Sequence, residues 1–85
     1  MADITIFDID EADWIDLRDN LAGMDWSMQR GGGLDHSWAI LCKGEFRISM
    51  EYDRWAEGQV SFDARQKIEI LKEMPKDFVA RYLSR

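Results

Sequence analysis

The strongest constraint on the fold is an alternation of apolar residues on both sides of one tight-turn signal, Lys43-Gly44. Apolar side chains recur at every second position on either side of this dipeptide: Trp38, Ile40 and Cys42 before it, and Phe46, Ile48, Met50 and Tyr52 after it. A period of two is typical of a strand with one buried face. The sequence therefore predicts an antiparallel hairpin over residues 38–52.

Helical periodicity brackets this hairpin. Trp14, Leu17 and Leu21 follow one helical stripe, and Gly23 offers a stop, which predicts a helix over residues 11–22. A second helix is expected after a cap at Ser61 or Asp63 and ends before Pro75, which can open a short third helix.

Two further segments complete the prediction. Alternation over residues 24–29 predicts a strand, and residues 31–33 (Gly-Gly-Gly) and 54–59 are expected to be loops. Residues 4–9 fit either a short edge strand or an ordered N-terminal arm. We therefore expect an α+β fold, a small single domain over residues 1–85, with a three-stranded antiparallel sheet packed against helices in the order α-β-β-β-α-α.

The strand and helix patterns also predict the core. Phe46, Ile48 and Met50 are expected to share a buried face with Trp14, Leu17, Ile68 and Leu71. The predicted order of elements resembles the double-stranded-RNA-binding fold. That family holds phosphates with basic residues, whereas the first helix here is acidic, so the resemblance implies no RNA binding for this chain.

The negative charge is concentrated in one segment. Residues 3–19 hold seven acids and one base, and their summed charge equals the formal net charge of the chain, −6. The ten acids and ten bases that follow cancel each other. On the predicted first helix, Asp13, Asp16 and Asp19 form a ridge opposite the apolar stripe, with Asp10 just before it. Three interpretations stay open: a solvated face, a contact face for a basic partner, and a divalent-cation site.

The hairpin ends in a second candidate contact, formed by Tyr52, Arg54 and Trp55. These residue types are enriched at binding hot spots. The alternative is that Tyr52 and Trp55 only close the edge of the core.

The sequence predicts no catalytic or metal site and no cofactor. A calcium loop counted from Asp8 lacks the glycine needed at its sixth position, where Asp13 stands. His36 and Cys42 are isolated from the partners that catalysis or zinc binding requires, and the glycine run lacks the Lys-Ser/Thr of a phosphate loop. We therefore expect a protein that is not an enzyme.

Location and partner follow from composition. A single cysteine, no signal-peptide pattern at residues 1–5 and no long apolar run predict a cytoplasmic protein. An acidic protein is repelled by nucleic acid and by anionic lipid, so we expect neither as a direct partner. The expected partner is a protein with a basic surface. The sequence leaves the oligomeric state open.

Three functional hypotheses follow. The first is an inhibitor that occupies a basic, possibly nucleic-acid-binding surface, as phage-encoded anti-CRISPR proteins and other DNA mimics do; this comparison rests on size and charge. The second is an immunity or antitoxin-like protein that blocks a toxic enzyme. The third is a small metal-dependent enzyme. The sequence argues against it, because it contains no cluster of metal-ligating residues.

Overall fold

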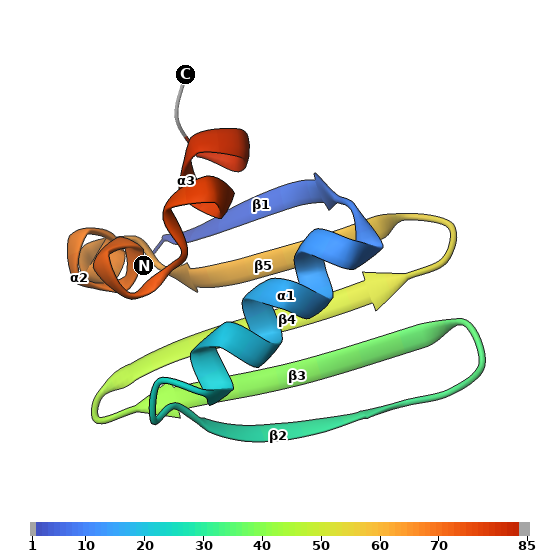
Figure 1. The fold of residues 1–85 in the computed structure, drawn as a ribbon, viewed down its shortest axis with the longest axis horizontal. Helices are drawn as coiled ribbons and strands as arrows, with labels where there is room; N and C mark the ends of the chain where they lie inside the picture. The colour runs from blue at the N-terminus through green and yellow to red at the C-terminus, as the bar shows by residue number, and fades with distance from the viewer. Residues whose placement is uncertain (1, 84–85) are drawn as a thin grey trace.

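The computed structural model describes residues 2–83. Over this range the chain forms five strands, three α-helices and one short 3₁₀ turn (Figure 1). In chain order these are β1 (Asp3–Ile9), α1 (Glu11–Ala22), β2 (Ser27–Gly32), β3 (His36–Lys43), β4 (Phe46–Asp53), β5 (Glu57–Asp63), η1 (Ala64–Gln66), α2 (Lys67–Glu73) and α3 (Lys76–Tyr82).

The strands form one antiparallel sheet in the order β1-β5-β4-β3-β2. The predicted three-stranded sheet and the order α-β-β-β-α-α are therefore wrong. Two segments account for the difference. Residues 3–9 form the edge strand β1, paired through Ile6 and Val60, and residues 57–63 form β5 where a loop was expected over 54–59.

The hairpin expected from the alternating pattern is confirmed as β3 and β4. Ala39 lies opposite Met50 and Leu41 opposite Ile48, so the buried residues of the two strands share one face. The buried face predicted for β3 is wrong, because the alternating residues Trp38, Ile40 and Cys42 are half-buried on the opposite, uncovered face. Gly44 has φ of 62° in the turn, a conformation that glycine adopts without steric cost. The first helix is also confirmed with its expected bounds, residues 11–22.

Gly58 explains why β5 was missed. The residue reads as a chain break in the sequence, but in the structure it is a buried residue of β5 that lies beneath Trp14. A Cβ atom at this position would come 2.7 Å from Trp14 Cδ1 and 2.9 Å from the carbonyl oxygen of Ile9. This glycine therefore marks a close approach of helix and strand rather than a loop.

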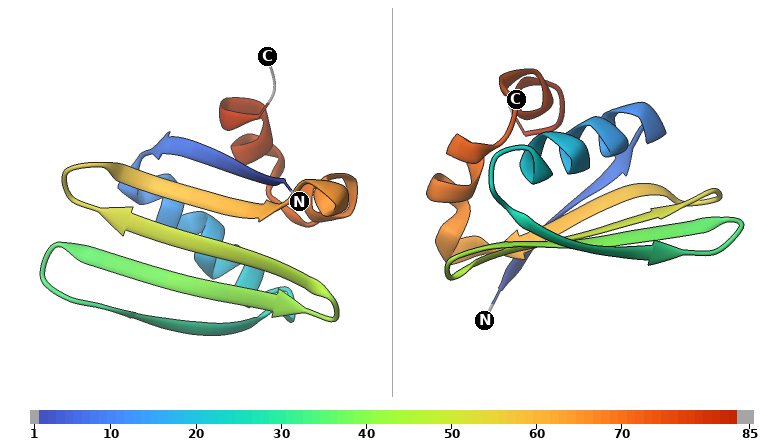
Figure 2. Two further views of the ribbon diagram at one scale, coloured as in Figure 1. Left: turned by 180° about the vertical axis from the view of Figure 1, so that it is seen from behind. Right: turned by 60° about the horizontal axis from the view of Figure 1, so that its bottom comes forward.

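All three helices lie on the same side of the sheet, and α1 crosses its face (Figures 1 and 2). Figure 2 shows that no element of the described chain covers the opposite face. The core fills the space between the helices and the sheet. Its fully buried large side chains are Ile9, Trp14, Leu17, Leu21, Leu41, Ile48, Met50, Val60 and Ile70.

The expected core is correct for the sheet and α1 but wrong for one position of the second helix. Ile68 is 67% exposed, whereas Ile70 is fully buried. The helix begins only at Lys67, after the 3₁₀ turn, so its apolar face follows Ile70 and Met74 instead of Ile68. Phe46 and Leu71 pack against the core and are half-buried.

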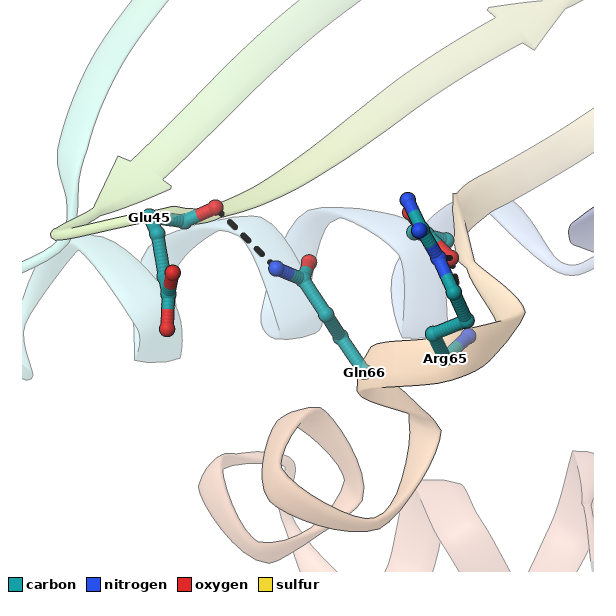
Figure 3. A network of polar contacts seen from close by, with 4 residues as sticks. Glu45, Arg65 and Gln66 are labelled. Carbon is teal, nitrogen blue, oxygen red and sulfur yellow. Dashed lines mark hydrogen bonds and ion pairs between the residues drawn. The ribbon is translucent and has the colours of Figure 1, made fainter. Parts of the chain in front are cut away.

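Polar contacts fix the start of this helical segment. Asp63 caps η1 by accepting a hydrogen bond from the backbone N–H of Arg65 at 2.8 Å, which confirms one of the two expected cap residues. The amide of Gln66 donates to the carbonyl oxygen of Glu45 at 3.2 Å and ties η1 to the turn between β3 and β4 (Figure 3). Pro75 ends the first of the two helices and precedes α3, as predicted.

Candidate functional site

Two turns at one end of the sheet are tied directly together. The turn between β2 and β3 and the turn between β4 and β5 lie at the end where β1 leads into α1 (Figure 1). The backbone N–H of Arg54 donates to the carbonyl oxygen of Asp35 at 3.0 Å. The guanidinium of Arg54 also pairs with the carboxylate of Asp35, with Nη1 3.2 Å from Oδ1. Each turn therefore limits the movement of the other.

Asp53 shapes the turn that carries Trp55. Its carboxylate accepts hydrogen bonds from the backbone N–H groups of Trp55 and Ala56, at 2.8 and 3.3 Å. An aspartate that bonds the backbone two and three residues ahead is a typical turn former. Glu57 then returns the chain to β5 with φ of 64°. The backbone of Trp55 is thus fixed while its side chain projects into solvent.

Large apolar side chains flank the Asp35–Arg54 contact. Leu34 has a relative exposure of 103% and Trp55 of 80%, the two highest values among the large hydrophobic residues that the structure describes. The guanidinium carbon of Arg54 lies 5.6 Å from the centroid of the Trp55 ring, within cation–π range. We call Leu34, Asp35, Arg54 and Trp55 the loop tip.

A hollow of about 260 Å³ lies at the base of the loop tip. Its lining comprises Glu11 of α1, Leu34, Asp35, His36, Ser37, Tyr52 and Arg54. Tyr52 is half-buried, with its ring centroid 5.9 Å from that of Trp14, and its hydroxyl lies 3.5 Å from a carboxylate oxygen of Glu57. Tyr52 therefore does close the edge of the core, and it also lines the hollow.

Carboxylates surround the base of the loop tip. The pKa of Tyr52 is raised, first by desolvation and then by the charges of Glu11, Glu57 and Asp10. The nearby cation is Arg54, and His36 stands 3.9 Å from Asp53. Exposed apolar groups on an acidic base suit a partner in which basic residues surround an apolar pocket.

The acids of the predicted ridge on α1 are partly occupied by contacts within the protein. Tyr82 donates its hydroxyl to Asp13 at 2.6 Å, and Arg81 donates to the same carboxylate oxygen at 2.7 Å. These two contacts hold the pKa of Asp13 below its ordinary value. Asp19 pairs with Arg18 at 3.0 Å. Two of the three ridge charges therefore already have a cationic neighbour.

The remaining acids of the predicted site are Asp16, which lies between Asp13 and Asp19 on α1, and Asp10, which precedes the helix. Asp16 is exposed and lines a hollow of about 330 Å³ between α1 and α3, together with Asn20 and Asp77. Asp10 precedes α1 without a side-chain capping bond, and its backbone N–H donates to the hydroxyl of Tyr82 at 3.2 Å.

The structure thus divides the seven predicted contact residues into two groups. Tyr52, Arg54 and Trp55 lie at the loop end of the sheet, and the charge of Asp10 acts on Tyr52. The ridge residues lie along α1, and one of them faces α3. Sequence reasoning missed Leu34 and Asp35 at the loop tip. The available signal was a leucine within the polar, glycine-rich segment 31–37.

The other surfaces of the described residues show weaker signs of a binding or metal site. A hollow of about 600 Å³ at the opposite end of the sheet holds Arg47, but its second arginine, Arg65, already makes two side-chain bonds to Asp63. Within residues 2–83 no three His, Cys, Asp or Glu side chains are grouped so that they could bind a metal ion. Across the same described range, no helix has both the length and the apolar character to cross a bilayer.

No protein-family model, curated protein or solved structure matches this chain.

Proposed function

We propose that the protein is a non-enzymatic interaction module that docks its loop tip on a partner protein with a basic surface. The observation that carries the proposal is the exposure of Leu34 and Trp55 on two turns joined by Arg54 and Asp35. Exposed apolar side chains gathered at one place on a small domain mark an interaction surface.

The rigidity of the loop tip supports this function. Two backbone N–H groups bonded to Asp53 and the double contact between Arg54 and Asp35 fix both turns before any partner arrives. Preorganised contact residues lose less conformational entropy on binding, so more of the contact energy appears as affinity. Tryptophan and arginine are also among the residues that dominate binding energy at interfaces.

Charge supports the choice of a basic partner. The chain carries a formal net charge of −6, and the charges of Glu11, Glu57 and Asp10 raise the pKa of Tyr52 at the base of the loop tip. Such a field attracts a basic surface over long range and accelerates encounter. If that surface otherwise holds nucleic acid, docking excludes the nucleic acid and the protein acts as an inhibitor. We place this action in the cytoplasm, where a lone cysteine stays reduced.

The test compares matched variants in an affinity capture. The immobilised wild-type chain, the loop-tip variant Leu34→Ser/Trp55→Ser and the control variant Met24→Ser/Ile68→Ser are exposed to the same extract. The control removes two exposed hydrophobic residues from other parts of the surface, with 43% and 67% exposure. We expect a protein with a basic surface that the wild type and the control retain and the loop-tip variant loses.

The captured protein is then purified, and direct binding is measured. Equal capture by all three forms would place the contact elsewhere and contradict the proposal. Loss by the control as well as the loop-tip variant would show that capture depends on exposed hydrophobic area alone, which also contradicts it.

A further inference from the structure

We infer that the protein pairs with a second copy of itself through the free edge of β2, independently of the function proposed above. β2 is the last strand of the sheet and pairs only with β3 among the described residues. No other element within residues 2–83 lies along its outer side (Figures 1 and 2). Its outward backbone groups can therefore accept another strand.

The hairpin geometry shows which groups point outward. The N–H of Gly33 donates to the carbonyl oxygen of His36 at 2.8 Å, so these two residues form a hydrogen-bonded pair. Such pairs alternate along an antiparallel ladder, and the continuous register therefore turns Gln29 and Gly31 toward β3. Met28 and Arg30 direct their N–H and C=O groups to the open edge.

The two edges of the sheet differ in how they are protected. β1 carries an irregular register between Ile6 and Ile9, a positive φ of 59° at Asp8 and a second exposed carboxylate at Asp3. A bulge and charges of this kind discourage strand addition. β2 has a continuous register from Ser27 to Gly32 and contains no proline; it carries one charge, at Arg30, and a positive φ of 153° only at its last residue, Gly32.

The low charge of this edge leaves it open to a second copy. Residues 26–34 contain one charged residue, Arg30, in a chain with net charge −6. Two copies therefore approach with little repulsion at this edge. A two-fold axis at Gln29 brings Met28 opposite Arg30 of the second copy and Gln29 opposite its own equivalent, so no like charges face each other.

The pairing also extends the uncovered face of the sheet. Trp38, Ile40 and Cys42 are half-buried on this face, one strand in from the edge. Pairing of two β2 strands places the two stripes on one continuous ten-stranded sheet, because each copy contributes five strands.

Sedimentation of the full chain over a range of concentrations tests the inference. We expect the wild type to shift from the 10.0 kDa monomer toward twice that mass as concentration rises to about 1 mM, the weak range expected for a small interface. Arg30→Pro removes an outward N–H without breaking a bond to β3, and we expect a monomer. Arg30→Ala keeps the N–H and should still dimerise. Circular dichroism checks that each variant is folded.

A charge exchange at Gln29 tests the register without proline. Gln29→Glu and Gln29→Lys each oppose like charges at the two-fold axis, so each alone should dimerise up to about fivefold more weakly than the wild type. An equimolar mixture should restore the dimer as a heterodimer. A wild type that stays monomeric up to about 1 mM overturns the inference. A dimer unaffected by Arg30→Pro and by both Gln29 variants overturns it as well.

Discussion

Asp13 of α1 and Arg81 of α3 join the first helix to the last through a contact of 2.7 Å. Tyr82, the next residue of α3, donates its hydroxyl to the same carboxylate oxygen at 2.6 Å. An acid that the sequence places on a surface ridge is thus a connection between helices. Its contribution to stability and its contribution to surface charge can be separated by experiment.

Asparagine at position 13 should weaken the fold, because the neutral amide loses the ion pair with Arg81. Asp16→Asn is the matched control, since Asp16 is exposed on the same helix. Its replacement relieves repulsion between like charges one turn apart. Urea unfolding should give a lower midpoint for Asp13→Asn and an equal or higher midpoint for Asp16→Asn. Equal midpoints for the two variants would show that the Asp13 contacts contribute nothing.

Stability should fall as the solution is acidified below the ordinary carboxylate range. Side-chain bonds from Arg65 lower the pKa of Asp63 from 3.8 to about 2. The pKa of Glu73 is also lowered, first by its bond from Lys43 and then by that from Trp26. A carboxyl with a lowered folded pKa stabilises the protein fully above its unfolded pKa and loses this effect as pH falls through the folded value.

Urea unfolding between pH 5 and pH 2 checks this dependence. The midpoint of the wild type should decline over this interval. Asp63→Asn should decline less steeply between about pH 4 and pH 2, because its side chain does not titrate. If the unfolding midpoints of the two proteins decline equally with pH, Asp63 does not contribute to the loss of stability.

Alanine at position 58 should destabilise the protein by roughly 1–3 kcal/mol, the usual cost of an overpacked core. The added methyl would lie 2.7 Å from Trp14 Cδ1 and 2.9 Å from the Ile9 carbonyl oxygen, and neither neighbour is a flexible chain end. Gly33→Ala is the control, because a methyl group there would have no atom of the described residues within 4 Å. Thermal melts should separate the two, and similar losses would contradict the close contact of α1 with β5.

Core truncations distinguish the buried face of α2 from its exposed face. Ile48→Ala and Ile70→Ala should each cost roughly 2–5 kcal/mol, because both side chains are fully buried. Ile68→Ala should change stability by less than about 0.5 kcal/mol, as surface substitutions do. Denaturant unfolding measures all three. A large loss at Ile68 together with a small one at Ile70 would restore the face expected from the sequence.

The elements that were predicted from the sequence are those whose apolar residues repeat with the period of a helix or of a strand. α1 and β4 were predicted because their buried apolar residues repeat with one period. β3 was predicted as a strand, but residues 38–42 are apolar on both faces, so the pattern did not show that Ala39 and Leu41 form the buried face. β5 was missed because Gly58 is required by Trp14, a residue 44 positions earlier, and no local pattern records that requirement. The burial of Ile70 instead of Ile68 depends on a 3₁₀ turn that shifts the start of the helix.

The same distinction applies to the candidate site. Arg54 and Trp55 were predicted from residue type and stand next to each other in the chain. Leu34 and Asp35 join them only because the four-stranded run from β2 to β5 brings two turns to one end of the sheet. The neutralisation of Asp13 by Arg81 likewise depends on a contact between residues 68 positions apart.

The most direct test of the account is the affinity of the captured partner for the wild type and for Leu34→Ser/Trp55→Ser at several salt concentrations. Each residue, if it is a hot spot, contributes at least about 2 kcal/mol, so the double variant should bind at least about 100-fold more weakly. The wild-type association rate should fall as salt rises, because acids around the loop tip attract a basic surface. Unchanged affinity of the double variant, or an association rate independent of salt, would contradict the account.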